Sequence, residues 1–302
     1  VKPEESSYRD RMQRVFARAA LARPVGAAWK TGAFAAARRG LDGRAFGCVD
    51  KRTFCSSSPA GGAGQPGGDA SKPYDVVVFG GNGFVGSNTC KALVAMGKRV
   101  AAVNRSGAPS IKEAWVDQVD FIKGDAFQPE AWRHILKGAG GVVASIGAFG
   151  SYEHMKMING DANIMITEEA AAAGVKRMVF VSASFPPFPA SVPLRGYIEG
   201  KQAVEEVVRA RFPDTHTILK PSVIFGPQDN AHPLIAGIRA LGPIQEPIMT
   251  HSPLGRLASL PMVGGVFLPW SPVHAVGKAA AAGATQDLPL RTFSPHDIAN
   301  YK

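Results

Sequence analysis

The sequence predicts a doubly wound α/β fold, in which helices cover both faces of a parallel β-sheet. Three observations indicate this class. Short β-branched runs alternate with longer segments of helical spacing over residues 73–221. The first of these runs leads into a glycine-rich turn. Hydrophobic residues make up 45% of the chain and charged residues 19%, which supports a sizeable core and excludes global disorder.

The alternation assigns each element in turn. Six strands are expected, at residues 75–79, 99–103, 119–122, 141–146, 177–181 and 215–219. Helices are expected between them, at 84–96, at 129–136, over a long segment that ends at 173, and at 197–211. After Pro221 the pattern loosens into Pro- and Gly-rich sequence. This predicts a small, irregular C-terminal lobe from about residue 222.

The N-terminal part is expected to lie outside the folded domain, which we place at residues 73–302. Residues 1–11 precede the first methionine and are interpreted as untranslated upstream sequence or an expression remnant. Residues 12–54 are rich in Arg and Ala and poor in acidic residues, which is typical of a mitochondrial targeting presequence. A solvated basic arm and a plastid transit peptide are the alternatives. Residues 55–72 contain mostly Gly, Ser, Pro and Ala and predict a flexible linker.

The distribution of charge argues against a nucleic-acid partner. The formal net charge is +10, but residues 12–54 carry nine basic and two acidic residues, and residues 1–11 are neutral overall. Only +3 remains for residues 55–302, too little for a nucleic-acid-binding surface. Three cysteines and seven scattered histidines indicate neither a disulfide framework nor a metal site. No apolar stretch reaches the ~18 residues that a transmembrane helix needs.

The turn after the first strand is the candidate cofactor loop. Its glycines follow a G-x-x-G-x-x-G spacing between a predicted strand and a predicted helix. Glycine permits the tight turn, the close approach of a pyrophosphate and the contact between helix and strand, while the helix N-terminus attracts the phosphates. An empty structural turn is the alternative. The loop residues expected to bind a dinucleotide are Gly80, Asn82, Gly83, Phe84, Val85 and Gly86.

The ends of the next strands predict the remaining cofactor contacts. A carboxylate after the second strand would bind the ribose hydroxyls of NAD, whereas an Arg favours the 2′-phosphate of NADP. The sequence has Asn104, Arg105 and Ser106 there, so NADP(H) is expected rather than NAD(H). Asp125, after the third strand, is expected to meet the adenine. The ribose and nicotinamide are expected beside the end of the fourth strand, at Ser145 and Gly147.

A candidate catalytic pair opens the helix after the fifth strand. Tyr197 and Lys201 are four residues apart and therefore share one helix face. A nearby ammonium is expected to lower the pKa of Tyr197 and make it useful as an acid or base. Ser184, at the end of the fifth strand, could orient a substrate carbonyl. An ordinary amphipathic helix is the alternative, since this Tyr-Lys spacing is common.

With these motifs in place, residues 73–302 resemble an atypical, extended-type short-chain dehydrogenase/reductase, a family with a Rossmann fold. The segment 197–226, with its Y-x-x-x-K helix and K-P-S-x-I-F-G run, is similar to the nucleotide-binding accessory subunit of mitochondrial respiratory complex I. That resemblance implies a tightly held NADPH without established turnover, bound by Tyr197, Lys201 and Pro221 among others. It also implies partner subunits of an inner-membrane complex and a peripheral position on the matrix side.

The C-terminal residues 254–298 are also similar to a relative implicated in ubiquinone biosynthesis and found with plastid lipid bodies. Two hypotheses follow. The first, favoured by segment 197–226, is a non-catalytic, cofactor-stabilised subunit of complex I. The second is a free NADP(H)-dependent reductase of a quinone or lipophilic precursor, with Tyr197 as proton donor. The apolar segment 257–270 fits a lipid- or quinone-contacting surface in either case, and ordinary core is its alternative.

Overall fold

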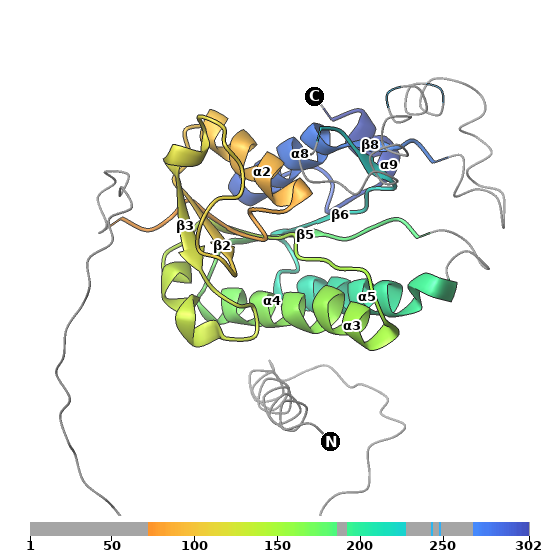
Figure 1. The fold of residues 1–302 in the computed structure, drawn as a ribbon, viewed down its shortest axis with the longest axis horizontal. Helices are drawn as coiled ribbons and strands as arrows, with labels where there is room; N and C mark the ends of the chain where they lie inside the picture. The colour runs from red at the N-terminus through yellow and green to blue at the C-terminus, as the bar shows by residue number, and fades with distance from the viewer. Residues whose placement is uncertain (1–71, 186–191, 228–242, 244–247, 249–267, 302) are drawn as a thin grey trace, which may run out of the picture. The chain divides into compact units, whose positions relative to one another are not determined.

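The computed structural model describes residues 72–185, 192–227, 243, 248 and 268–301. These residues form three layers, with a seven-stranded sheet between two layers of helices (Figure 1). The predicted doubly wound fold is confirmed. The expected presequence, nearly all of the linker, and residues 257–267 of the apolar segment lie outside the described residues.

The sheet is parallel throughout the described chain. Its order is β3 (Val119–Lys123), β2 (Val100–Asn104), β1 (Val76–Phe79), β4 (Gly141–Ala144), β5 (Arg177–Val181), β6 (His216–Leu219) and β9 (Thr292–Phe293). The chain starts at the centre, builds outward to β3, and returns to add β4 on the other side of β1. The strand order therefore reverses between β1 and β4, where ligands of such sheets bind at the carboxyl ends of the strands.

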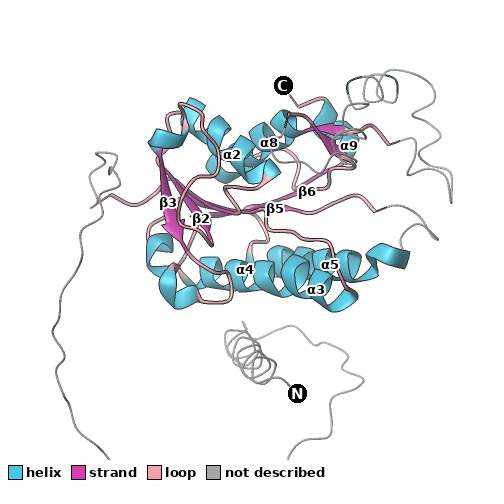
Figure 2. Cartoon of the chain, viewed as in Figure 1, coloured by secondary structure: helices cyan, strands magenta, loops and turns pink. Residues whose placement is uncertain are grey.

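Helices cover both faces of the sheet (Figure 2). One face contacts α2 (Phe84–Ala95), α8 (Val273–Thr285) and α9 (Pro295–Ala299). The other contacts α4 (Ala162–Ala172) and α5 (Arg195–Arg211). The expected helix at 129–136 is instead two 3₁₀ turns, Pro129–Ala131 and Arg133–Leu136, which bury Trp132 edge-on against Phe79. Successive residues of the buried strands alternate between the two cores, so these strands are apolar on both faces.

The long helix expected before residue 173 is divided into α3 (Tyr152–Lys156), a π-helical turn (Met157–Asp161) and α4. The turn lies where this segment packs closely against α5. A Cβ on Gly160 would lie 3.0 Å from the Cα of Gly200, so both helices need glycine at the crossing. Single π-turns of this kind are frequent at functional sites.

Residues 273–301 rejoin the main domain, although the sequence predicts an irregular lobe from about residue 222. A short parallel pair, β7 (Ile224–Phe225) and β8 (Ser271–Pro272), precedes α8. Helix α8 is mostly Ala and Gly and is buried around much of its circumference. Its exposed residues are His274 and Lys278, so the polar stripe by which a sequence reveals a surface helix is narrow here. Most of residues 228–267 lie outside the described ranges.

Candidate functional site

The glycine turn after β1 has a geometry that only glycine satisfies at two positions. Gly80 has a φ of +86°, and its carbonyl oxygen accepts a 2.8 Å hydrogen bond from the amide of Gly83. A Cβ on Gly86 would lie 2.1 Å from that same oxygen. The glycines at the two ends of the predicted motif are therefore needed to bring the first turn of α2 against the end of β1.

This turn fits a dinucleotide phosphate group. Helix α2 begins after Gly83, which is exposed, and no side chain caps the helix. An uncapped helix N-terminus beside a glycine turn is a common anion site. The Ser145 hydroxyl donates to the carbonyl of Phe79 at 2.7 Å and so joins the ends of β4 and β1 at the strand-order reversal. Of the other predicted loop residues, Val85 contacts the core on the α2 face, and Phe84 is half-buried.

Most of the predicted polar residues at the end of β2 shape the local turn. The Asn82 amide donates to the carbonyl of Ala108 at 2.7 Å, which ties the glycine turn to the segment after β2. The Ser106 hydroxyl donates to the Asn104 side-chain oxygen at 3.0 Å and to Ala108 at 2.9 Å. Arg105 is exposed between them. The side chains on either side of Arg105 thus hold the loop.

Two further predicted contacts have structural roles of their own. The Asp125 carboxylate accepts a hydrogen bond from the amide of Phe127 at 2.9 Å. The main-chain carbonyl of Asp125 accepts one from the Trp132 indole at 2.7 Å. Gly147 is exposed after β4, and a Cβ there would approach the side-chain oxygen of Asn159 to 3.0 Å. Both residues lie after the carboxyl ends of strands, on the edge where the glycine turn lies.

Lys201 is buried between the ends of β4 and β5. It is 3% exposed, and its ammonium donates to the carbonyls of Val181 at 2.7 Å and Ile146 at 3.4 Å. The nitrogen lies 5.8 Å from the centroid of the Tyr197 ring, so the predicted pair is brought together on one helix face. Burial lowers the pKa of Lys201 to about 7, and the charge of Glu205 opposes that shift.

The predicted lowering of the Tyr197 pKa is wrong. Burial raises the pKa of Tyr197 to about 12, because the phenolate loses solvation and Lys201 directs its hydrogen bonds to main-chain carbonyls. Ser184 forms its hydrogen bonds with the segment after β6. Its hydroxyl donates to the carbonyl of Lys220 at 2.8 Å, and its amide donates to the carbonyl of Pro221 at 2.7 Å. Pro221 is buried and thus anchors the end of β5.

Aromatic side chains surround Tyr197. Phe149, from the loop after β4, is 71% exposed and stacks on Tyr197 with centroids 5.3 Å apart and planes 14° apart. Phe185 meets the Tyr197 ring edge-on at 6.4 Å. The surroundings of the phenol are therefore largely apolar.

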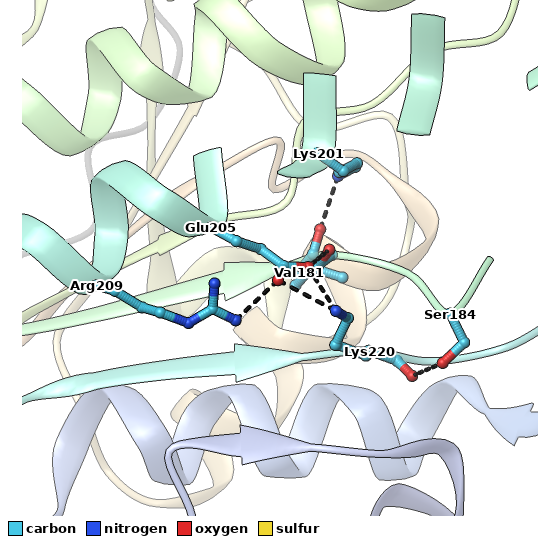
Figure 3. A network of polar contacts seen from close by, with 7 residues as sticks. Val181, Ser184, Lys201, Glu205, Arg209 and Lys220 are labelled. Carbon is cyan, nitrogen blue, oxygen red and sulfur yellow. Dashed lines mark hydrogen bonds and ion pairs between the residues drawn. The ribbon is translucent and has the colours of Figure 1, made fainter. Parts of the chain in front are cut away.

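Two polar residues of the site were not predicted. Asn159, in the π-turn, is fully buried, and its amide donates to the carbonyls of Ala148 and Met155 at 2.7 and 2.8 Å. Near Lys201, the Glu205 carboxylate accepts hydrogen bonds from the side chains of Ser182, Arg209 and Lys220 (Figure 3). Glu205 could have been found from the sequence, because it continues the row of Tyr197 and Lys201 at a spacing of four. Asn159 gave no such signal.

The described residues contain no cluster of three or more His, Cys, Asp or Glu side chains that could hold a metal ion. Cys90 is a free, buried thiol whose pKa burial raises to about 12. Within the described ranges, no helix has both the length and the hydropathy that a membrane span requires.

Comparison with known proteins identifies the family. The model of a family described as NAD(P)H-binding matches residues 80–236, just over half of the chain. An uncharacterised chloroplastic protein of Arabidopsis thaliana is 42% identical over 158 residues, covering 51% of this chain and 52% of the relative. A 2-alkyl-3-oxoalkanoate reductase of Stenotrophomonas maltophilia is 32% identical over 178 residues, again covering 51% and 52%. The chain spans about half the length of these curated relatives.

Two further similarities cover other shares of the chain. MIOREX complex component 2 of Saccharomyces cerevisiae is 37% identical over 86 residues, covering 27% of this chain and 31% of the relative. Among solved structures, MoeE5 in complex with UDP-glucose and NAD superposes with a TM-score of 0.49 at 19% identity, covering 72% of this chain and 74% of that chain.

Proposed function

The chain belongs to the NAD(P)H-binding family, and from this premise we propose that it is an NADP(H)-dependent oxidoreductase of the short-chain dehydrogenase/reductase type. We propose that it reduces a carbonyl group of an apolar substrate. The observation that carries the proposal is the placement of Tyr197 and Lys201 on one helix face, beside the carboxyl ends of β4 and β5. The glycine turn that would hold the nucleotide lies at the same edge of the sheet.

The residues present fit NADP(H). The turn between Gly80 and Gly86 supplies a helix N-terminus for the diphosphate, and Arg105 supplies an exposed cation after β2 for a 2′-phosphate. Arg105→Asp should therefore shift the binding preference from NADP(H) toward NAD(H), measured as the ratio of the two Kd values. An unchanged ratio would contradict this role for Arg105.

The protonation state of Tyr197 suits reduction. Bound NADPH supplies the hydride that goes to the carbonyl carbon, and the carbonyl oxygen then needs a proton. Because the Tyr197 pKa is about 12, the side chain is a phenol at neutral pH and can donate that proton. The Lys201 ammonium, near the same ring, would stabilise the phenolate that remains until solvent returns the proton.

The aromatic surroundings favour an apolar substrate. Phe149 and Phe185 flank Tyr197, so the groups beside the reacting carbonyl would contact aromatic surface. The reductase relative from Stenotrophomonas maltophilia is named for an alkyl-substituted 3-oxo acid, which supports a ketone with aliphatic substituents. A quinone or another lipophilic precursor belongs to the same chemical class of carbonyl compounds.

The test has two steps. Denaturing extraction of the purified chain, followed by mass spectrometry, should release NADP(H). NADPH oxidation should then be followed with alkyl ketones and short-chain quinones, comparing the wild type with Tyr197→Phe. We expect the variant to retain the nucleotide and lose activity by about 10²–10⁴-fold, the usual contribution of a general acid. Full activity in Tyr197→Phe would contradict the assignment of Tyr197.

A second candidate is a cofactor-stabilised, non-catalytic accessory subunit of respiratory complex I, peripheral on the matrix side of the mitochondrial inner membrane. The observation that favours it is the Ser184 hydroxyl, which donates its hydrogen bond to the main-chain carbonyl of Lys220. The yeast relative is named as a component of a complex, which is consistent with an assembled role. This candidate predicts co-migration with a large membrane complex on a native gel and no NADPH oxidation with quinones. A monodisperse, NADPH-oxidising protein would contradict it.

A further inference from the structure

Helix α5 presents a row of four polar side chains at a spacing of four residues. Tyr197, Lys201, Glu205 and Arg209 follow one another along the same face. The middle two are almost completely buried, at 3% and 4% exposed. The proposed function uses Tyr197 and Lys201, and it gives no role to Glu205.

The Glu205 carboxylate is the centre of a buried network that joins α5 to β5 and β6 (Figure 3). It accepts from the Ser182 hydroxyl at 2.6 Å, from the Arg209 guanidinium at 2.9 Å and from the Lys220 ammonium at 3.1 Å. Burying an ionised carboxylate costs several kcal/mol unless cations and hydrogen bonds compensate. Replacement by an apolar residue would often serve packing equally well. The charge therefore calls for an explanation other than packing.

The network reaches Lys201 through one peptide group. The carbonyl of Val181 accepts the short bond from Lys201, while the amide of Ser182 donates to the carbonyl of Leu219 at 2.8 Å. The hydroxyl of the same Ser182 is the group bound by Glu205. Through the Ser182 hydroxyl, Glu205 thus fixes the peptide group between Val181 and Ser182, whose carbonyl accepts the hydrogen bond of Lys201.

We infer that Glu205 is a positioning residue of the cofactor site, which holds Lys201 between the ends of β4 and β5 and keeps it as an ammonium where the nucleotide would bind. The inference rests on the proposed function.

The charges around Lys201 support this role. Among the described residues, the titratable groups that face Lys201 are Tyr197 and Glu205, both from α5, because β4 and β5 face it with main-chain carbonyls. The π-turn faces this region with the neutral Asn159. Arg209 and Lys220 face Glu205 and balance part of its charge. Burial lowers the pKa of Lys201 to about 7, and Glu205 is the group that raises it. Without that carboxylate, the pKa of Lys201 would fall further below that of an ordinary lysine.

The experiment is a calorimetric titration of the full chain with NADP⁺ across the neutral pH range, comparing the wild type with Glu205→Gln. We expect the variant to bind NADP⁺ about threefold to tenfold more weakly near pH 7 and to approach wild-type affinity at lower pH, where Lys201 regains its proton. The phosphate of the nucleotide also titrates in this range, but it does so equally for every variant. The readout is therefore the difference between the curves.

The matched control is Glu206→Gln, which removes a carboxylate from the next, exposed position of α5 and should leave the curve unchanged. Ser182→Ala breaks the link to the peptide and keeps the carboxylate, so it decides the question if Glu205→Gln does not fold. We expect it to weaken NADP⁺ binding severalfold without lowering Tm enough to unfold the protein.

The outcomes separate this inference from the proposed function. Equal binding curves for Glu205→Gln and the wild type would overturn the inference alone. A loss of affinity that is the same at every pH would show a merely structural network and would overturn it as well. A wild-type chain that binds neither NADP⁺ nor NAD⁺ would overturn the proposed function, and the inference with it.

Discussion

The backbone around Gly86 leaves no room for a side chain. Substitution of Gly86 should therefore impair the nucleotide site specifically. Because a Cβ would lie 2.1 Å from the Gly80 oxygen, Gly86→Ala must push α2 away from β1. We expect a loss of roughly 1–3 kcal/mol in the free energy of unfolding and no measurable NADP⁺ binding. Chemical denaturation and calorimetry measure the two effects.

The matched control is Gly97→Ala, at the opposite end of α2. Gly97 has a φ of +66° and open space around it, so alanine there adds backbone strain without a clash. We expect about 1 kcal/mol of destabilisation and unchanged NADP⁺ affinity. Equal loss of binding in both variants would show that general instability, rather than the turn, explains the effect of Gly86→Ala.

Lys201 and Tyr197 predict an unusual dependence of stability on pH. The Lys201 pKa is about 7 in the folded chain against 10.5 in its ordinary state, so unfolding takes up a proton between these values. Stability from this group therefore rises with pH over that window, by at most about 1.4 kcal/mol per pH unit. The Tyr197 pKa is raised from 10.0 to about 12, so its contribution is complete below 10 and is lost as pH rises toward 12.

Lys201→Met should remove the rising part of this curve and leave the alkaline decline. The measurement is Tm against pH for both proteins, with Lys137→Met, at an exposed position of the same chain, as the control expected to behave like the wild type. If the Lys201→Met curve kept the wild-type rise above neutral pH, the buried-ammonium interpretation would fail.

Single residues also show how far the sequence could predict the site. The glycine turn was predictable, because main-chain geometry restricts which residue can occupy Gly80 and Gly86. The hydrogen bonds of Asn82 and Ser184 were not, because they depend on carbonyls of Ala108 and Lys220 that distant segments bring near. The direction of the Tyr197 shift was also missed, since sequence spacing reveals a neighbouring charge but not the depth of burial.

At the scale of elements, the six predicted strands all occur, whereas the two-residue strands β7, β8 and β9 were not predicted. A strand buried on both faces is a continuous apolar run; β1 has three consecutive valines, and β5 is apolar from its second residue on. The π-turn before α4 gave no such signal, and the Gly160–Gly200 contact at which it lies joins segments far apart in the sequence. Helix α8 was missed because it is mostly Ala and Gly and is exposed only at His274 and Lys278, so its polar stripe is narrow.

The contact between α2 and α8 depends on Gly277. A Cβ at this position would lie 2.8 Å from the backbone of Asn88, so Gly277→Val must separate the two helices. We expect a loss of about 1–3 kcal/mol in unfolding free energy. NADP⁺ affinity should also fall, because α2 carries the glycine turn. Lys278→Val, at the next and exposed position of α8, controls for β-branching and should cost only a few tenths of a kcal/mol. Comparable losses in the two variants would contradict the close helix contact.

At the scale of the whole molecule, the described site lies between residues 80 and 226, while most of the net charge lies before residue 55. The two parts should therefore be separable. We predict that residues 1–72, fused to a fluorescent reporter, direct it to mitochondria and are cleaved there, because an Arg-rich, acid-poor segment responds to an organelle potential that is negative inside.

The control replaces the basic residues of 12–54 by glutamine, which removes the positive charge and keeps the length; it should leave the reporter in the cytosol. The competing outcome is import into plastids, which the chloroplastic relative suggests. Import into plastids alone would contradict the mitochondrial prediction. A chain that begins at residue 72 should meanwhile bind NADP⁺ as the full chain does, because the glycine turn, Arg105, Tyr197 and Lys201 all belong to the folded domain. A lower affinity of the shortened chain would show that the N-terminal part contributes to the site.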